Sequence, residues 1–325
     1  MSILERLGAG PIVQAGMGGG LSRHELAAAV SEAGGLGTIA VNGAAAIRHE
    51  LAVARSLTAR PLAVNLLLPF ARRDWFEAAS EADVVVTFWG RPRRRTTRAW
   101  IHQCGSVEEA RAAYGAGADA VIVQGVEAGG HVRGETPALE LLERARAALP
   151  ADYPVLVAGG IARGDDVRRA LEAGAAGAVA GTRFLLSEES RAHPDYRQRL
   201  LDAGETLLTD LFGMGWPAPH RVVPNAATAR WLERPASGSA ELRSAPALHR
   251  AINRASAPGA RYMPAAVQRR LVAAQRPGSR LLTPQSATDD APQALVDAGP
   301  LYAGETVKRI DEVRPAAEIV AELTP

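Results

Sequence analysis

Short apolar runs rich in Val, Ile and Leu alternate with alanine-rich stretches of helical character over the first two hundred residues, and this alternation limits the possible fold more than any other feature. The apolar runs occupy residues 11–17, 36–41, 61–68, 83–90, 100–105, 119–125, 154–160 and 177–186. A repeated strand–helix order predicts parallel strands joined by right-handed crossovers. Eight such units favour a closed (β/α)8 barrel, the TIM barrel, over an open doubly wound sheet.

Local signals at the ends of the expected helices agree with this order. The stretch SRHELAAAVSEAGG begins with Ser22, has Glu25 at the capping-box spacing, and ends at Gly34–Gly35. The fourth unit is the weakest, because only RPRRRTTRA (91–99) separates its strand from the fifth. We therefore expect a short helix there, or none.

The pattern changes after the eighth unit. Residues 206–299 are rich in Pro, Ser, Arg and Ala, with short helical patches and little strand character. The stretch LYAGETVKRIDEVRPAAEIVAEL (301–323) then returns to the spacing of an amphipathic helix. We predict a barrel formed by 1–205 together with 300–325, and a cap or insertion at 206–299 that precedes the last helix.

The composition narrows the class of protein. A chain of 325 residues with 47% hydrophobic residues can bury a large core. The net charge is only +2, and the dense basic cluster RPRRR (91–95) is better explained as a solvated loop than as a nucleic-acid contact. The single cysteine, Cys104, excludes an internal disulfide, as expected in a reducing compartment. With no apolar signal core and no window of about 20 apolar residues, we expect a soluble cytoplasmic protein without membrane contacts.

The loops after the carboxyl ends of the strands build the active site in a βα barrel, so the polar residues at those ends are the candidates. Asn65 and Gln124 are amides at the ends of apolar strands, where an unpaired side chain would cost about 1–3 kcal/mol. Each could bond a neighbouring backbone group, or the heteroatom edge of a flat ring that lies across the barrel mouth. Met17, after the first strand, would pack beside that ring or would simply fill the core.

Glycines follow the seventh and eighth strands. Gly159–Gly160 and Gly181–Thr182 can leave several backbone N–H groups unobstructed, and such groups bind a phosphate at these strands of a barrel. The simpler explanation is that glycine ends strands in tightly packed barrels. Because both pairs occur at consecutive strands, we favour the phosphate site.

The loop after the sixth strand reads VQGVEAGGH and ends at His131. Gly129 and Gly130 let the backbone turn inward, and an imidazole with a pKa near about 6.5 can take or give a proton at cellular pH. A satisfied surface histidine is the alternative to a catalytic acid/base, and Glu127 could serve only to tie down the loop. The other histidines have expected structural roles or lack the spacing of metal ligands, so no metal site is predicted: His24, His49, His102, His193, His220 and His249.

Together these stretches resemble the nitronate monooxygenase family, formerly called 2-nitropropane dioxygenases. The likeness is carried in order by PIVQAGMGGGLSRHELAAAVSEAGGLGTI, VNLLLP, VQGVEAGGH, PVLVAGGI and GTRFL. It covers about residues 1–215 and the final LYAGETV stretch.

The resemblance implies an FMN-containing βα barrel and makes His131 similar to the family's catalytic histidine. In that family the flavin oxidises alkyl nitronates with O₂ to a carbonyl compound and nitrite. The histidine acts as a base when the substrate is a neutral nitroalkane. The residues that the resemblance assigns to the FMN site are Met17, Asn65, Gln124, Gly129, Gly160, Gly181 and Thr182.

Two other functions stay open. The flavin-dependent enoyl-ACP reductases share the scaffold and an EAGGH loop, and NAD(P)H:quinone reductases share the scaffold. An NAD(P)H-dependent reductase of an enoyl thioester or quinone is therefore the alternative enzyme, and a flavin- or phosphate-binding barrel without turnover is the second alternative. The expected partners are a small substrate and O₂, with NAD(P)H in the reductase alternative and a second copy of the chain in a homodimer.

The sequence departs from the family pattern in two places near the expected site. Gly16 stands where the family's first strand commonly has proline. The loop reads GGHVRG, one residue longer than the frequent GGH-x-G form.

Overall fold

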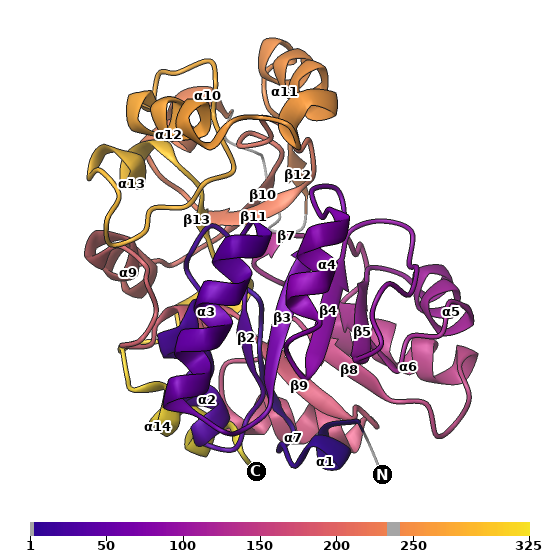
Figure 1. Ribbon diagram of the computed structural model, residues 1–325. Coiled ribbons are helices and arrows are strands. Elements are labelled where there is room, and N and C mark those ends of the chain that lie inside the picture. The colour runs from indigo at the N-terminus through magenta and orange to yellow at the C-terminus, as the bar shows by residue number, and fades with distance from the viewer. Residues whose placement is uncertain (1–2, 233–240) are drawn as a thin grey trace. The chain divides into compact units, whose positions relative to one another are not determined.

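The computed structural model describes residues 3–232 and 241–325 (Figure 1). The chain divides into two compact units. Unit 1 comprises Met1–Glu127, Arg133–Arg191 and Glu312–Pro325, and unit 2 comprises Ala128–Val132 and Ala192–Asp311. The two units are taken separately below.

Unit 1 contains a sheet of eight parallel strands in the order β1-β9-β8-β6-β5-β4-β3-β2. A parallel bridge between Val13 and Leu36 joins the two ends of this order, so the sheet is a nearly closed barrel. All eight predicted strands are confirmed. Their bounds are β1 (Ile12–Gln14), β2 (Gly37–Ile39), β3 (Leu62–Leu67), β4 (Val84–Phe88), β5 (Ala99–Cys104), β6 (Ala120–Gln124), β8 (Val155–Ala158) and β9 (Gly177–Ala180).

Helices connect these strands, as the alternating pattern predicts. The helices of unit 1 are α1 (Ile3–Leu7), α2 (His24–Glu32), α3 (Ala44–Leu57), α4 (Arg73–Ala79), α5 (Val107–Gly115), α6 (Ala138–Ala148), α7 (Gly164–Glu172), α8 (Thr182–Leu185) and α14 (Ala316–Leu323). The segment 89–98 between β4 and β5 is described and contains no helix, which confirms the truncated fourth unit. The eighth apolar run does not continue as a strand to 186, because α8 begins at Thr182.

The core of unit 1 follows the period of two along each strand. In β6, Val121 and Val123 pack against the surrounding helices, in the cluster that includes Leu141 and Leu142 of α6. Ile122 lies in a different cluster, whose members come mainly from the strands themselves. Successive side chains of a strand point to opposite faces, so one continuous apolar run supplies both the barrel interior and the surface that the helices cover.

Unit 2 contains a second sheet around β11 (His220–Val223). The partners of β11 are antiparallel strands: β10 (Leu207–Thr209), β13 (Leu301–Tyr302) and β7 (Gly130–His131). The parallel strand β12 (Leu242–Arg243) adds to β10. Only β10, β11 and β12 lie within 206–299, so the described part of this region has little strand character, as expected, although its short strands form a sheet with β7 and β13.

Short helices complete unit 2: α9 (Pro194–Leu201), α10 (Ala226–Trp231), α11 (Ala247–Ala260), α12 (Ala265–Ala274), α13 (Ala294–Ala298) and the 3₁₀ helix η1 (Glu305–Arg309). The predicted cap 206–299 falls in this unit, except for residues 233–240, which lie outside the described residues. No helix among the described residues is long and apolar enough to cross a membrane.

The expectation of one continuous helix over 301–323 was wrong. Leu301 and Tyr302 pair with β11 instead, and only α14 remains as the closing helix. Pro315 at the N-cap of α14 explains the break, because proline has no N–H to donate to a preceding helical turn.

Candidate active site

The loop after β6 is closed by backbone contacts that involve its polar residues. The side chain of Gln124 is buried, and its Oε1 accepts the N–H of Arg133 at 3.1 Å. A Cβ at Gly134 would overlap the carbonyl oxygen of Gln124, so only glycine fits where the loop returns. The carboxylate of Glu127 accepts the N–H of Ala138 at 3.0 Å, at the start of α6. Glu127 thus ties down the loop.

The glycines after β8 and β9 lie side by side at the carboxyl ends of paired strands. Gly159 and Gly160 have φ angles of 111° and 76°, in the left-handed region that favours glycine. Gly181 directly precedes α8, and Thr182 is its buried first residue. The structure therefore brings together the backbone segments that the sequence predicts to bind a phosphate.

Gly16 and Asn65 meet on unit 1, although they belong to the first and third strand–helix units. A Cβ on Gly16 would overlap the Asn65 side chain, so neither alanine nor proline fits at position 16 while Asn65 keeps this place. This contact gives a physical reason for the departure from the family's proline. Met17 is half-buried and packs against the helix-facing core.

His131 belongs to β7 in unit 2, where it pairs with His220 of β11. Its ring is stacked on Trp216, with centroids 3.7 Å apart and planes at 20°. The rings of His220 and Tyr302 each lie 5.4 Å from it. Gly129 packs against Ala303 and Gly304, in a space that a Cβ would fill.

Burial controls the charge of these two histidines. It lowers the pKa of His131 well below the usual value, and the nearby His220 lowers it further. Nε2 of His131 is buried, although the residue as a whole keeps partial exposure. Burial also lowers the pKa of His220 to about 4. Its Nδ1 bonds the Ala218 carbonyl at 2.9 Å, and its Nε2 accepts the N–H of Phe212 at 3.3 Å. Both imidazoles are therefore neutral at pH 7.

Sequence reasoning missed Trp216, His220 and Tyr302. The stretch FGMGWPAPH contains the first two, and its density of Gly, aromatic and His residues was the available signal. Without the pairing of β7, β11 and β13, nothing in the sequence connected that stretch with His131.

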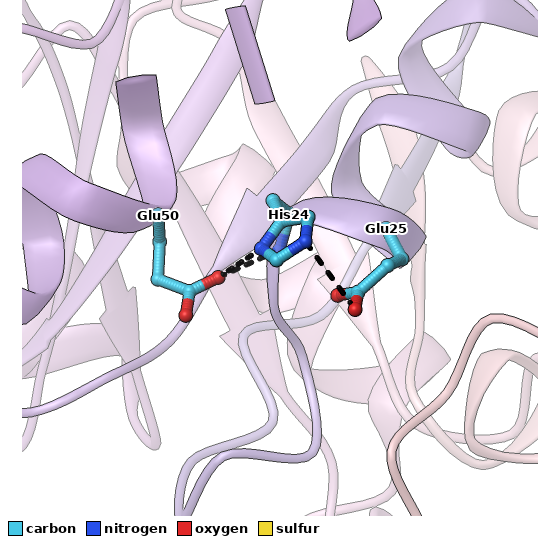
Figure 2. Close-up of side chains that lie close together, drawn as sticks. All are labelled: His24, Glu25 and Glu50. Carbon is cyan, nitrogen blue, oxygen red and sulfur yellow. Dashed lines mark hydrogen bonds and ion pairs between the residues drawn. The ribbon is translucent and has the colours of Figure 1, made fainter. Parts of the chain in front are cut away.

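A second group of polar side chains lies at the start of α2 (Figure 2). Nδ1 of His24 is 2.6 Å from Oε2 of Glu50, and the same oxygen accepts the backbone N–H of His24 at 3.0 Å. Glu25 lies 3.3 Å from Nε2 of His24, and its carboxylate also contacts Arg191 at 3.3 Å. The ligand types would suit a metal ion. However, the helix N–H and the guanidinium already partner these carboxylates, so the group is best explained as a cap that ties α2 to α3.

This cap replaces the one expected from the sequence. The N-cap residue of α2 is Arg23, and its side chain makes no cap hydrogen bond. The hydroxyl of Ser22 donates instead to the Thr38 carbonyl, and it accepts from Gln14 at 2.9 Å. His102 lies inside β5, as expected, with Nδ1 2.7 Å from the Thr87 hydroxyl.

Comparison with known proteins gives consistent results. The family model named "Nitronate monooxygenase" matches residues 2–88 and 91–325. A nitronate monooxygenase of Pseudomonas aeruginosa is 36% identical in an alignment 261 residues long that covers 61% of this chain and 73% of the relative. A "(3aS,4S,5R,7aS)-5-hydroxy-7a-methyl-1-oxo-octahydro-1H-indene-4-carboxyl-CoA dehydrogenase" of Mycobacterium tuberculosis is 33% identical over 234 residues, 66% of this chain and 62% of the relative.

Two solved structures are similar over almost the whole chain. FabK from Thermotoga maritima has a TM-score of 0.75 at 27% identity, covering 99% of this chain and 94% of its own. A nitroalkane oxidase from Streptomyces ansochromogenes has a TM-score of 0.74 at 29% identity, covering 99% and 96%. Both support the barrel assignment.

Proposed function

The chain belongs to the nitronate monooxygenase family, and from this premise we propose that it binds FMN and that His131 is the acid/base residue of its reaction. The chain is a flavin-dependent oxidoreductase that acts on alkyl nitronates, with O₂ as the oxidant and a carbonyl compound and nitrite as products. The observation that carries the histidine assignment is a neutral imidazole that is stacked on Trp216 and has a buried Nε2.

We assign the FMN contacts to glycine-rich strand ends and amides of unit 1. The N–H groups of Gly160, Gly181 and Thr182 would hold the phosphate, and Met17, Asn65 and Gln124 would lie along the ring. The left-handed φ of Gly160 and the adjacency of β8 and β9 support the phosphate contacts. Bound FMN would supply the redox chemistry, taking electrons from the substrate and passing them to O₂.

The proposed task of His131 is proton transfer. A neutral imidazole nitrogen can accept the α-proton of a nitroalkane, whereas an imidazolium cannot. A low pKa keeps His131 in the neutral form over the whole physiological range. A nitronate has already lost this proton, so it should depend much less on His131 than the neutral nitroalkane does.

The deciding measurement is anaerobic reduction of the flavin in the purified protein. Nitroethane and propionate 3-nitronate should bleach the flavin absorbance. His131→Ala should keep FMN but slow bleaching by nitroethane by roughly two to four orders of magnitude, with a smaller effect on the nitronate. Equal rates of flavin reduction by nitroethane in wild type and His131→Ala would show that His131 is not the acid/base residue and has only a structural role. A purified protein that does not bind FMN would contradict the whole proposal.

A reductase is the second candidate. The relative whose name describes a carboxyl-CoA dehydrogenase supports this candidate. Its reductant would be NAD(P)H, and its substrate would be an enoyl thioester or a quinone. Bleaching by NAD(P)H alone would favour this candidate. If neither nitro compounds nor NAD(P)H reduce the flavin, a binding barrel without turnover remains. We further propose a cytoplasmic location and a homodimer, which fractionation and light scattering would test.

A further inference from the structure

Three amide side chains occupy equivalent places in unit 1, directly beyond the apolar cluster that fills the barrel. Asn65, Gln103 and Gln124 lie on β3, β5 and β6, each two residues after a member of that cluster. The members that they follow are Ala63, Ile101 and Ile122. Because successive side chains of a strand alternate between its faces, all three amides lie on the interior face of the barrel, toward the carboxyl ends of the strands. This end of a βα barrel contains the active site.

Gln103 is the amide of the three to which the family resemblance assigns no role. In the parallel sheet it lies opposite Phe88 of β4 and Ile122 of β6. Ile101, two residues earlier on the same face, is completely buried, whereas Gln103 keeps partial exposure. On β5 the buried interior therefore ends at Gln103.

The three amides differ in their partners. Oε1 of Gln124 accepts the backbone N–H of Arg133 at 3.1 Å, and the side chain of Asn65 lies against Gly16. For the side-chain amide of Gln103, the described residues provide no hydrogen bond. A glutamine amide has two N–H donors and an acceptor oxygen. The donors of Gln103 therefore depend on water or on a ligand.

A flat ring that lies across the barrel mouth would exclude water from this amide. A donor that is buried without an acceptor costs binding free energy, so a ligand that covers Gln103 should offer it an acceptor. The proposed function brings two such acceptors to the mouth: the carbonyl oxygens of the flavin ring and the oxygens of the nitro group. Both gain negative charge during the proposed reaction, and a charged acceptor takes a stronger hydrogen bond than a neutral one.

We propose that the side-chain amide of Gln103 donates a hydrogen bond to a ligand oxygen at the barrel mouth, on the flavin ring or on the nitro group. This inference rests on the proposed function, which supplies both oxygens. A bond to the flavin raises its reduction potential, because the reduced ring carries more negative charge than the oxidised ring. A bond to the nitro group instead favours the substrate as its α-proton leaves.

Gln103→Met tests the proposal, because it removes the amide and keeps the length of the side chain. If the flavin is the acceptor, the Kd for FMN should rise at least about fivefold, and the midpoint potential of the bound flavin without substrate should fall. The fluorescence of FMN released on dilution of the holoenzyme measures this Kd. If the nitro group is the acceptor, both flavin properties should keep their wild-type values, and kcat/KM for nitroethane should fall at least about fivefold.

The matched control is Gln268→Met at an exposed position of α12, a helix without buried residues, and it should keep all three wild-type values. Gln103→Asn, which keeps the amide but withdraws it by one methylene, replaces Gln103→Met if that variant does not fold, and it should show the same loss. Wild-type values of all three quantities at position 103 would overturn the proposal, as would an equal loss in the control, while the proposed function would stand. A wild type that binds no FMN would contradict the proposed function and this inference together.

Discussion

Among single residues, Trp216 makes the closest ring contact with His131 that the structure describes. Its indole stacks on the imidazole of His131. The proposed reaction needs a neutral nitrogen of this imidazole to accept a proton, and the lowered pKa of His131 provides one. His220 and Tyr302 complete the surroundings within unit 2, and His220 is itself neutral at pH 7. Burial is the main cause that lowers the pKa of His131, and the neighbouring His220 acts in the same direction, so both favour the neutral imidazole.

Replacing Trp216 should therefore change the titration of His131. Trp216→Leu removes the stacked surface and admits water, so the pKa of His131 should rise toward about 6.5, whereas Trp216→Phe should keep it low. The titration of the ring nitrogens by NMR measures this without requiring turnover. In the nitroethane reaction, the acid limb of kcat/KM should move to higher pH in Trp216→Leu. Trp231→Leu, at another tryptophan of unit 2, is the control, and an unmoved His131 titration in Trp216→Leu would contradict the role.

Among the secondary-structure elements of unit 1, two helices have their first N–H groups capped by a carboxylate from a distant part of the chain. Glu50 of α3 caps α2, and Glu127 of the β6 loop accepts the N–H of Ala138 at α6. In both cases the accepting carboxylate is more than ten residues away in sequence. A capping rule that searches only the residue before a helix cannot find it, which explains the wrong choice of Ser22 for α2.

Glu50→Gln tests this kind of cap. The variant keeps the shape of the side chain but removes the charge from two partly buried hydrogen bonds, so the free energy of unfolding should fall by about 1–3 kcal/mol. Glu81→Gln is the control, because Glu81 pairs with Arg48 at an exposed position, and its loss should cost less than about 0.5 kcal/mol. Urea unfolding measures both. A lowering of the melting temperature by EDTA in wild type would instead favour a metal ion at His24.

For the molecule as a whole, the free energy of unfolding should depend on pH, because each unit contains a buried neutral histidine. Burial lowers the pKa of His102 in unit 1 to about 4, and His220 in unit 2 behaves alike. Glu109 raises and Arg133 lowers the pKa of His102, with smaller effects than burial. Above about pH 6.5 each histidine is neutral in both states and has no effect. Below it, the unfolded chain takes up protons that the folded chain does not, so stability falls between about pH 6.5 and 4.

His102→Gln should reduce this acid sensitivity. Each buried histidine contributes up to about 3 kcal/mol to the loss. The difference in urea midpoint between pH 7.5 and pH 5 should be smaller in His102→Gln than in wild type, even if the variant is less stable at both. His49→Gln, at an exposed position, should keep the wild-type difference. The same difference in all three proteins would refute the assignment to His102.

The sequence by itself determined the barrel and allowed residues at the strand ends to be proposed for the candidate site. Alternating apolar runs are a local property of the chain, and eight of them have essentially one closed arrangement. Gly160, Gly181 and Gln124 could be selected because strand ends are readable from the same pattern. The resemblance to the nitronate monooxygenases was equally local, since it rests on short motifs in order, and the family match confirms it.

Only the tertiary structure decided what surrounds these residues. His220 and Tyr302 reach His131 through pairing of strands that are 2–4 residues long, too short to show a period of two, and Trp216 stacks on His131 from the segment before β11. The cap from Glu50 and the contact of Gly16 with Asn65 likewise join distant segments. A side chain's pKa depends on burial and on neighbours in space, so the neutral state of His131 could not be read along the chain.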